Sequence, residues 1–258
     1  MLGAMIFRAI VAALIGLAAL SVAAGAQQPS PTGEHPQAVV ELYTSQGCTQ
    51  CPRANRLLGM FSHEPGVLAL TFPVGIWDYL GWRDTLARPE FSDRQRAYSD
   101  LLHVRGRFTP QLVFNGARQS GASDWDDAHA ALEATRADPA PDGATEVSVT
   151  RLRNDRVRVS LSANARGAGA EIWLLAYDPG PVFVVVSGGV NMNHTVPHYN
   201  LVKWIQRIDS WNGEATWFER DHCTPECAVL VQRPGPGQVI GVAYTYRPLR
   251  YPQPLLPY

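Results

Sequence analysis

Two cysteines separated by two residues, Cys48 and Cys51, are the side chains of this sequence best suited to chemistry. They lie between an apolar run at 38–43 and an amphipathic run at 54–61. A Cys-x-x-Cys at a junction between a strand and a helix is typical of a thiol–disulfide exchange site. The thiolate is the reactive form of cysteine, and N–H groups at a helix start stabilise it. We therefore predict that Cys48 attacks a disulfide and that Cys51 resolves the mixed disulfide.

Two other roles for this pair stay open at this point. The cysteines could form an inert structural disulfide, or supply two of the four ligands of a zinc ion. The remaining cysteines, Cys223 and Cys227, lie far along the chain, beyond a predicted domain boundary. A copper chaperone would need a histidine beside the dithiol, and the first half of the sequence offers none at a suitable place. We expect no bound metal and no other cofactor.

The composition is that of an ordinary globular protein. The chain has 258 residues, of which 46% are hydrophobic and 17% are charged. This length suits one large domain or two modest ones. Because the formal net charge is only -1, nothing favours electrostatic binding to nucleic acid or to anionic lipid. We expect no nucleic-acid partner.

The N-terminus has the pattern of a secretion signal. Arg8 precedes an apolar stretch at 9–24, and Ala24-Gly25-Ala26 fits an A-x-A cleavage site. The stretch is short for a membrane span of about 20 residues, so we predict a signal peptide at 1–26, cleaved after Ala26, and no stable membrane insertion. A flexible leader at 27–37 follows. The sequence thus predicts a periplasmic or secreted protein, in a compartment where disulfides form.

Residues 38–136 predict a first, α/β domain with the order strand, helix, strand, helix, strand, strand, helix. Glu41 is the one charge in the first strand. It either accepts the proton of Cys51 through water or faces solvent at the strand end. Trp77 belongs to an aromatic loop at 75–84, which either lines a cleft or covers the core from outside.

These elements resemble the thioredoxin superfamily, and the short motifs are most similar to those of glutaredoxins. The matching stretches are Gly47-Cys48-Thr49-Gln50-Cys51, Thr109-Pro110-Gln111-Leu112-Val113-Phe114-Asn115-Gly116 and Gly121-Ala122-Ser123-Asp124. The resemblance implies that Pro110 is a cis-proline that faces the dithiol. It also implies that the Thr109 backbone pairs with an extended thiol substrate. A protein or a glutathione-type substrate would then lie between Thr109 and the turn from Gly121 to Asp124, with Trp77 beside it.

A longer resemblance covers nearly the whole chain after the signal. It is to an uncharacterised family of secreted bacterial proteins, a domain of unknown function with a thioredoxin-like N-terminal half. The stretches that carry it include 40–48, 77–84, 94–98, 109–111 and 195–202. The chain departs from the family pattern at Pro73, Gly75 and Ile76. This resemblance implies a fold and no established reaction.

Residues 145–250 predict a second domain made of strands. A linker rich in proline and aspartate precedes it at 137–144. Alternating apolar residues and turn spacing favour an antiparallel, sandwich-like arrangement. Cys223 and Cys227 are expected to close a small loop as a structural disulfide in an oxidising compartment. The alternative is a second redox pair that passes electrons to Cys48 and Cys51. A proline-rich tail at 251–258 ends the chain.

The pattern as a whole predicts an exported thiol–disulfide oxidoreductase with Cys48, Cys51, Pro110 and Glu41 at its centre. Thr109, Gly121, Asp124 and Trp77 are expected to bind the substrate. The alternatives are a non-catalytic envelope protein stabilised by the same disulfide, and a copper chaperone on a thioredoxin-like fold.

Overall fold

The computed structural model describes residues 36–245, which all belong to one compact unit. The predicted signal peptide, the tail and most of the leader lie outside the described residues. Among the described helices, none is long and apolar enough to cross a membrane. The first half contains β1 (Ala38–Thr44), α1 (Cys51–Phe61), β2 (Val67–Pro73), the short 3-10 helix η1 (Asp78–Leu80), α2 (Pro89–Leu101), β3 (Gln111–Phe114), β4 (Arg118–Gly121) and α3 (Trp125–Ala137). This is the predicted order of strands and helices.

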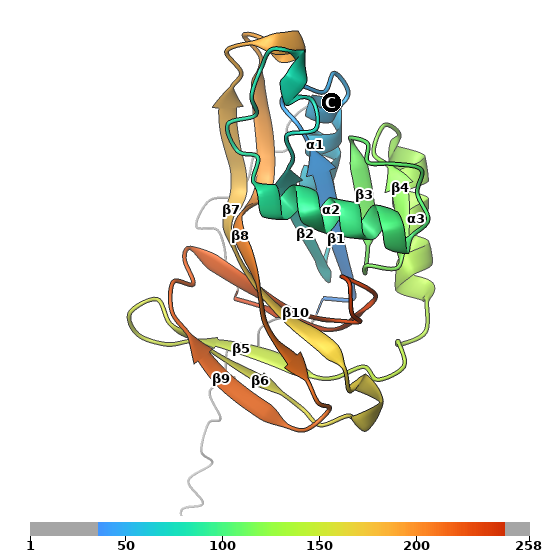
Figure 1. The fold of residues 1–258 in the computed structure, drawn as a ribbon, viewed down its shortest axis with the longest axis vertical. Coiled ribbons are helices and arrows are strands. Elements are labelled where there is room, and N and C mark those ends of the chain that lie inside the picture. Colours follow the sequence, from blue (N-terminus) through green and yellow to red (C-terminus); the bar gives the residue numbers. More distant parts are fainter. Residues whose placement is uncertain (1–35, 246–258) are drawn as a thin grey trace, which may run out of the picture. The chain divides into compact units, whose positions relative to one another are not determined.

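The second half consists of strands and two short 3-10 helices. It contains β5 (Val147–Arg151), β6 (Val157–Leu161), η2 (Ala165–Gly167), β7 (Ala170–Val185), η3 (Gly189–Asn191), β8 (Thr195–Trp211), β9 (Thr216–Arg220), β10 (Glu226–Gln232) and β11 (Val239–Tyr244). The described strands form an eight-stranded sheet in the order β11-β10-β7-β8-β2-β1-β3-β4 and a three-stranded sheet in the order β5-β6-β9 (Figure 1).

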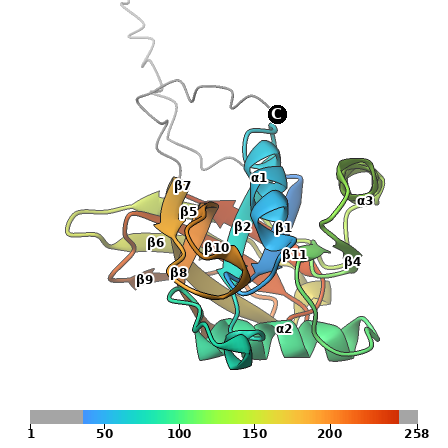
Figure 2. The ribbon, with the colours of Figure 1, turned by 90° about the horizontal axis from the view of Figure 1, so that it is seen from above.

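Strand β1 is the centre of the first half because it is buried along its whole length. It pairs in parallel with β2 and antiparallel with β3. Successive side chains of a strand point to opposite faces, so β1 supplies two different cores. Val40 and Leu42 pack with α1 and α3, whereas Val39 and Tyr43 pack with α2. Figure 2 shows α1 and α2 on opposite sides of the sheet.

The two halves share one sheet, and the predicted separation into two domains is not confirmed. Strand β8 joins β2 through a single paired position, Thr71 with Leu201. Side chains reinforce this narrow seam: the Thr71 hydroxyl donates to the Tyr199 carbonyl at 2.5 Å, and the Asn200 amide donates to the Ala69 carbonyl at 2.8 Å. The segment 137–144, whose composition predicted a linker between domains, connects the end of α3 to β5 of the small sheet.

The small sheet packs on one face of the large one. A buried cluster joins Val149 and Val159 of the small sheet to Leu174 and Val229 of the large sheet. The sandwich expected for the second half is therefore present in part, while β7, β8, β10 and β11 also continue the sheet of the first half. A second cluster contains residues from Val39 to Tyr244, so the two halves also share a hydrophobic core.

Candidate dithiol site

Cys48 and Cys51 form a disulfide at the start of α1, with their Cα atoms 5.3 Å apart. The helix begins at Cys51 itself, and Pro52 occupies its first turn. No side chain caps this helix start, and its first turn contains no acidic residue. When the disulfide is reduced, the positive end of the α1 dipole therefore favours a thiolate at Cys48.

The two sulfurs differ in exposure. Cys48 keeps 6% of its surface exposed and Cys51 only 1%. Cys48 precedes the helix, while Cys51 lies in its first turn against the core. Of the two sulfurs, that of Cys48 is thus the more accessible from outside.

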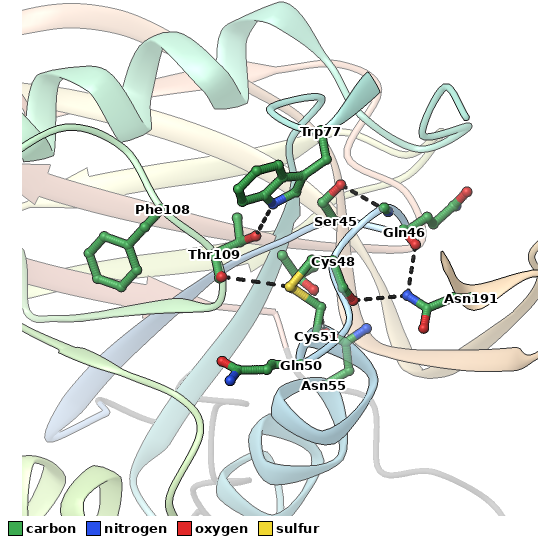
Figure 3. The surroundings of a disulfide bond; sticks show 12 residues. Ser45, Gln46, Cys48, Gln50, Cys51, Asn55, Trp77, Phe108, Thr109 and Asn191 are labelled. Carbon is green, nitrogen blue, oxygen red and sulfur yellow. Dashed lines mark hydrogen bonds between the residues drawn. A yellow bond between two sulfur atoms is a disulfide. The ribbon is translucent and has the colours of Figure 1, made fainter. Parts of the chain in front are cut away.

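Thr109 and Pro110 lie directly against the disulfide. The Thr109–Pro110 peptide bond is cis, and the sulfur of Cys48 lies 3.6 Å from the Thr109 carbonyl oxygen. The indole of Trp77 donates to the Thr109 hydroxyl at 2.8 Å (Figure 3). Trp77 is half-buried. The structure thus brings five of the predicted site residues to one place: Cys48, Cys51, Thr109, Pro110 and Trp77.

The loop before Cys48 is held from the second half of the chain. The side-chain amide of Asn191 in η3 donates to the carbonyl oxygens of Gln46 and Cys48, at 2.8 and 2.9 Å (Figure 3). Asn191 is 97% buried, since only 3% of its surface is exposed. The sequence alone does not predict this role, because 143 residues separate Asn191 from Cys48. No local pattern connects positions so far apart.

A buried aspartate fixes the same loop from the aromatic segment. The carboxylate of Asp84 accepts from the backbone N–H groups of Gln46, Leu86 and Ala87. Burial raises the pKa of Asp84, and these three donors oppose the rise. The indole of Trp82 donates to the Gln46 side chain at 2.9 Å. The aromatic loop at 75–84 therefore supports the disulfide loop from one side, as Asn191 does from another.

Glu41 has neither of the roles predicted for it. It lies on the β1 face that packs with α2, whereas Cys51 lies on the α1 face, and it is 1% exposed. Arg94 donates to both of its carboxylate oxygens, at 2.7 and 2.8 Å. Tyr43 and Tyr98 also donate to it. Because the sheet separates it from the disulfide, Glu41 is a buried structural charge and cannot relay a proton from Cys51.

The turn from Gly121 to Asp124 lies beside the cysteine loop. The Ser123 hydroxyl donates to the side chain of Gln50, between the two cysteines, at 2.9 Å. The carboxylate of Asp124 caps α3 by accepting from the N–H groups of Asp126 and Asp127. One oxygen of Asp124 is thus already used in helix capping.

The second cysteine pair is far from this site. Cys223 and Cys227 form a disulfide, as predicted, and both are fully buried in the core between the two sheets. Elsewhere, Glu64, His129 and Glu133 place potential metal-ligand atoms within 4.8 Å of one another. Arg136 forms ion pairs with both glutamates, so their charge is already compensated.

The model of a family described as "Protein of unknown function (DUF1223)" matches residues 39–232. No curated protein matches the chain. A crystal structure of protein AGR_C_4864 from Agrobacterium tumefaciens superposes with a TM-score of 0.69 at 27% identity. The match covers 85% of this chain and 99% of that one.

Proposed function

This chain belongs to the DUF1223 family of proteins of unknown function, and we propose that it is a thiol–disulfide oxidoreductase with a thioredoxin-like first half, exported from the cytoplasm. The observation that carries the proposal is the disulfide of Cys48 and Cys51 at an uncapped helix start, with the Cys48 sulfur 3.6 Å from the Thr109 carbonyl. An extended substrate beside Thr109 would bring its own sulfur to Cys48.

The exchange needs only the cysteine pair and the substrate. A substrate thiolate attacks the sulfur of Cys48, the bond between Cys48 and Cys51 breaks, and Cys51 leaves as a thiolate. A second substrate thiolate then attacks the substrate sulfur of the mixed disulfide and releases Cys48 as a thiolate. Two electrons pass from the substrate dithiol to the cysteine pair, and the two protons of the substrate thiols go to solvent or to the new thiolates. The reverse reaction reduces a substrate disulfide.

The test compares the reduced chain with its Cys48→Ser and Cys51→Ser variants on 2-hydroxyethyl disulfide, a small neutral substrate. We expect each reduced wild-type chain to reduce one equivalent of this disulfide to two thiols and to become the Cys48–Cys51 disulfide. We expect Cys51→Ser to accumulate a mixed disulfide on Cys48, detected as added mass, because no resolving thiol remains. Cys48→Ser is the matched control, since it retains the other three cysteines and should form no adduct. Equal reduction of the substrate by wild type and Cys48→Ser would refute the proposal.

A structural disulfide is the second candidate, and the deep burial of both cysteines favours it. The reduction potential separates the two functions. Structural disulfides have potentials below about -300 mV, whereas exchange catalysts lie above this range. We expect a value above it. A lower value, together with a large loss of stability on reduction, would assign the pair to stabilisation of the helix start.

A further inference from the structure

Large apolar side chains are concentrated at the surface around the disulfide. Eight such residues are more than 40% exposed among those described, and six of them lie on only two segments, η1 and the β7–β8 hairpin. We call these six the apolar rim: Tyr79, Leu80, Phe183, Val185, Val190 and Met192. Single exposed apolar residues are common on proteins, but a grouping next to a candidate site indicates an interaction surface.

Contacts join both segments of the rim to the disulfide loop. The ring of Tyr79 packs against that of Trp77, with centroids 6.1 Å apart. The Trp77 indole in turn donates a hydrogen bond to the Thr109 hydroxyl. Val190 and Met192 flank Asn191, which holds the Cys48 carbonyl. Their side chains are 56% and 55% exposed, while Asn191 between them is buried. The rim therefore begins at the edge of the cysteine loop on two sides.

Phe183 and Val185 continue the rim along the face of the sheet that carries α1. Phe183 lies opposite Pro197 in the β7–β8 pair, and opposed residues point to the same face. Tyr199, two residues beyond Pro197, shares this face, and its ring contacts α1 at Gly59. Asn55, one helical turn after Cys51, donates to the Pro197 carbonyl at 2.8 Å. Asn55 and Pro197 thus connect Cys51 to Phe183, through one hydrogen bond and one strand pairing.

Strand β7 also offers backbone groups beside these side chains. Strand β10 pairs with β7 only over 171–177. Among the described residues no strand pairs with the outer edge of β7 at 181–185. Such an edge can accept an added strand, with backbone bonds for affinity and side-chain contacts for selectivity.

On the basis of the proposed function, we infer that the substrate of the dithiol is a polypeptide with an extended apolar segment next to its cysteine. The segment would rest on the apolar rim and pair with the edge of β7. Glutathione is a poorer fit because it is a short, doubly carboxylated peptide with no apolar side chain to place on the rim. The inferred substrates are therefore apolar stretches of protein that contain a cysteine, and not thiols in general.

The test measures reduction of three disulfides by the reduced chain: oxidised glutathione and the homodimers of two peptides. One peptide is Gly-Val-Phe-Cys-Val-Leu-Gly, and the other replaces its apolar residues with serine and asparagine. The chain donates two electrons and becomes the Cys48–Cys51 disulfide, and each substrate yields two thiols. We expect kcat/KM for the apolar peptide to exceed that for the polar peptide and for glutathione by about tenfold or more, as burial of one or two apolar side chains allows.

Variants locate this preference on the surface. Phe183→Ser with Val185→Ser, and separately Tyr79→Ser with Leu80→Ser, should bring the ratio of apolar to polar kcat/KM close to one. Trp217→Ser is the matched control, because this ring is 64% exposed but lies on β9, under Arg158. Its removal should leave the ratio of apolar to polar kcat/KM unchanged.

Three results would overturn the inference. They are equal rates on all three disulfides, a preference for glutathione, or a stable dimer that the Phe183→Ser, Val185→Ser variant dissociates, because a second copy would then cover the rim. Failure to reduce 2-hydroxyethyl disulfide at all would refute the proposed function instead, so the two failures are distinguishable.

Discussion

At the scale of single residues, His198 is an ionisable side chain enclosed where water cannot reach it. It lies on β8 with 1% of its surface exposed, and its Nδ1 has no hydrogen-bond partner among the described residues. Burial lowers its pKa from the usual 6.5 to about 4. The imidazole is thus neutral in the folded chain at pH 5, whereas the same side chain is protonated in the unfolded chain.

This difference predicts a loss of stability in mild acid. Between pH 6.5 and about 4, the unfolded chain takes up a proton at His198 that the folded chain does not. The free energy of unfolding should therefore fall as the pH drops through this window, by on the order of 3 kcal/mol for this site. Urea unfolding at pH 7 and pH 4.5 measures the loss, and His198→Leu should lessen it by a similar amount. An identical acid loss in the variant would contradict this account.

At the scale of elements, the disulfide loop depends on supports from two other segments. The residues at 46–48 form no regular structure of their own. Asp84 fixes the Gln46 N–H, and Asn191 fixes the carbonyls of Gln46 and Cys48. Because Asn191 lies at the tip of the β7–β8 hairpin, the second half of the chain sets the position of the reactive loop.

Removing this support should destabilise the loop. Asn191→Ala removes the side-chain donor of the buried Gln46 carbonyl and leaves the Cys48 carbonyl with the Cys51 N–H alone, and we expect the free energy of unfolding to fall by about 1–3 kcal/mol. Asn191→Asp should cost more at pH 7, because a carboxylate would face both carbonyl oxygens. Urea unfolding measures both, and faster hydrogen exchange at 46–49 should accompany the loss.

The exposed neighbour Met192 provides the control, since Met192→Ala removes no hydrogen bond that the structure contains. Unchanged stability and exchange in Asn191→Ala would show that the loop holds its shape without the hairpin tip.

Local patterns predicted the individual elements much better than their assembly. The Cys-x-x-Cys spacing, the apolar period of α1 and the Thr109–Pro110 strand start are short-range signals, and each element formed where it was expected. Glu41 was misjudged because its partners, Arg94 and Tyr98, come from α2, on the opposite face of the sheet from α1. The sequence contains the residues of this network, but no local pattern indicates that they come together in the core.

At the scale of the whole molecule, the same network joins the two halves of the chain. Arg94 bonds Glu41 and also donates to the Gln232 side chain at 2.7 Å, across 138 residues. Gln232 donates in turn to the Tyr98 hydroxyl at 3.1 Å. Burial and the nearby charge of Glu41 raise the pKa of Tyr98, so the phenol stays a hydrogen-bond donor. The hydrophobic cluster around this network likewise combines Tyr43 and Phe91 with Leu230 and Tyr244.

Because the sheet, a core and the buried hydrogen bond from Arg94 to Gln232 all connect residues on both sides of the 137–144 linker, we expect the chain to unfold as one unit. Urea transitions followed by far-ultraviolet circular dichroism and by tryptophan fluorescence should coincide. A fragment of residues 36–144 should not fold alone, since β2 would lose its neighbour β8 and Arg94 would lose Gln232. A buried polar group that loses its hydrogen-bond partner costs about 1–3 kcal/mol, and more when the group is charged, which is a sizeable share of the stability of a small domain. Two separate transitions, or a fragment with slow hydrogen exchange, would instead support the two-domain organisation predicted from the linker.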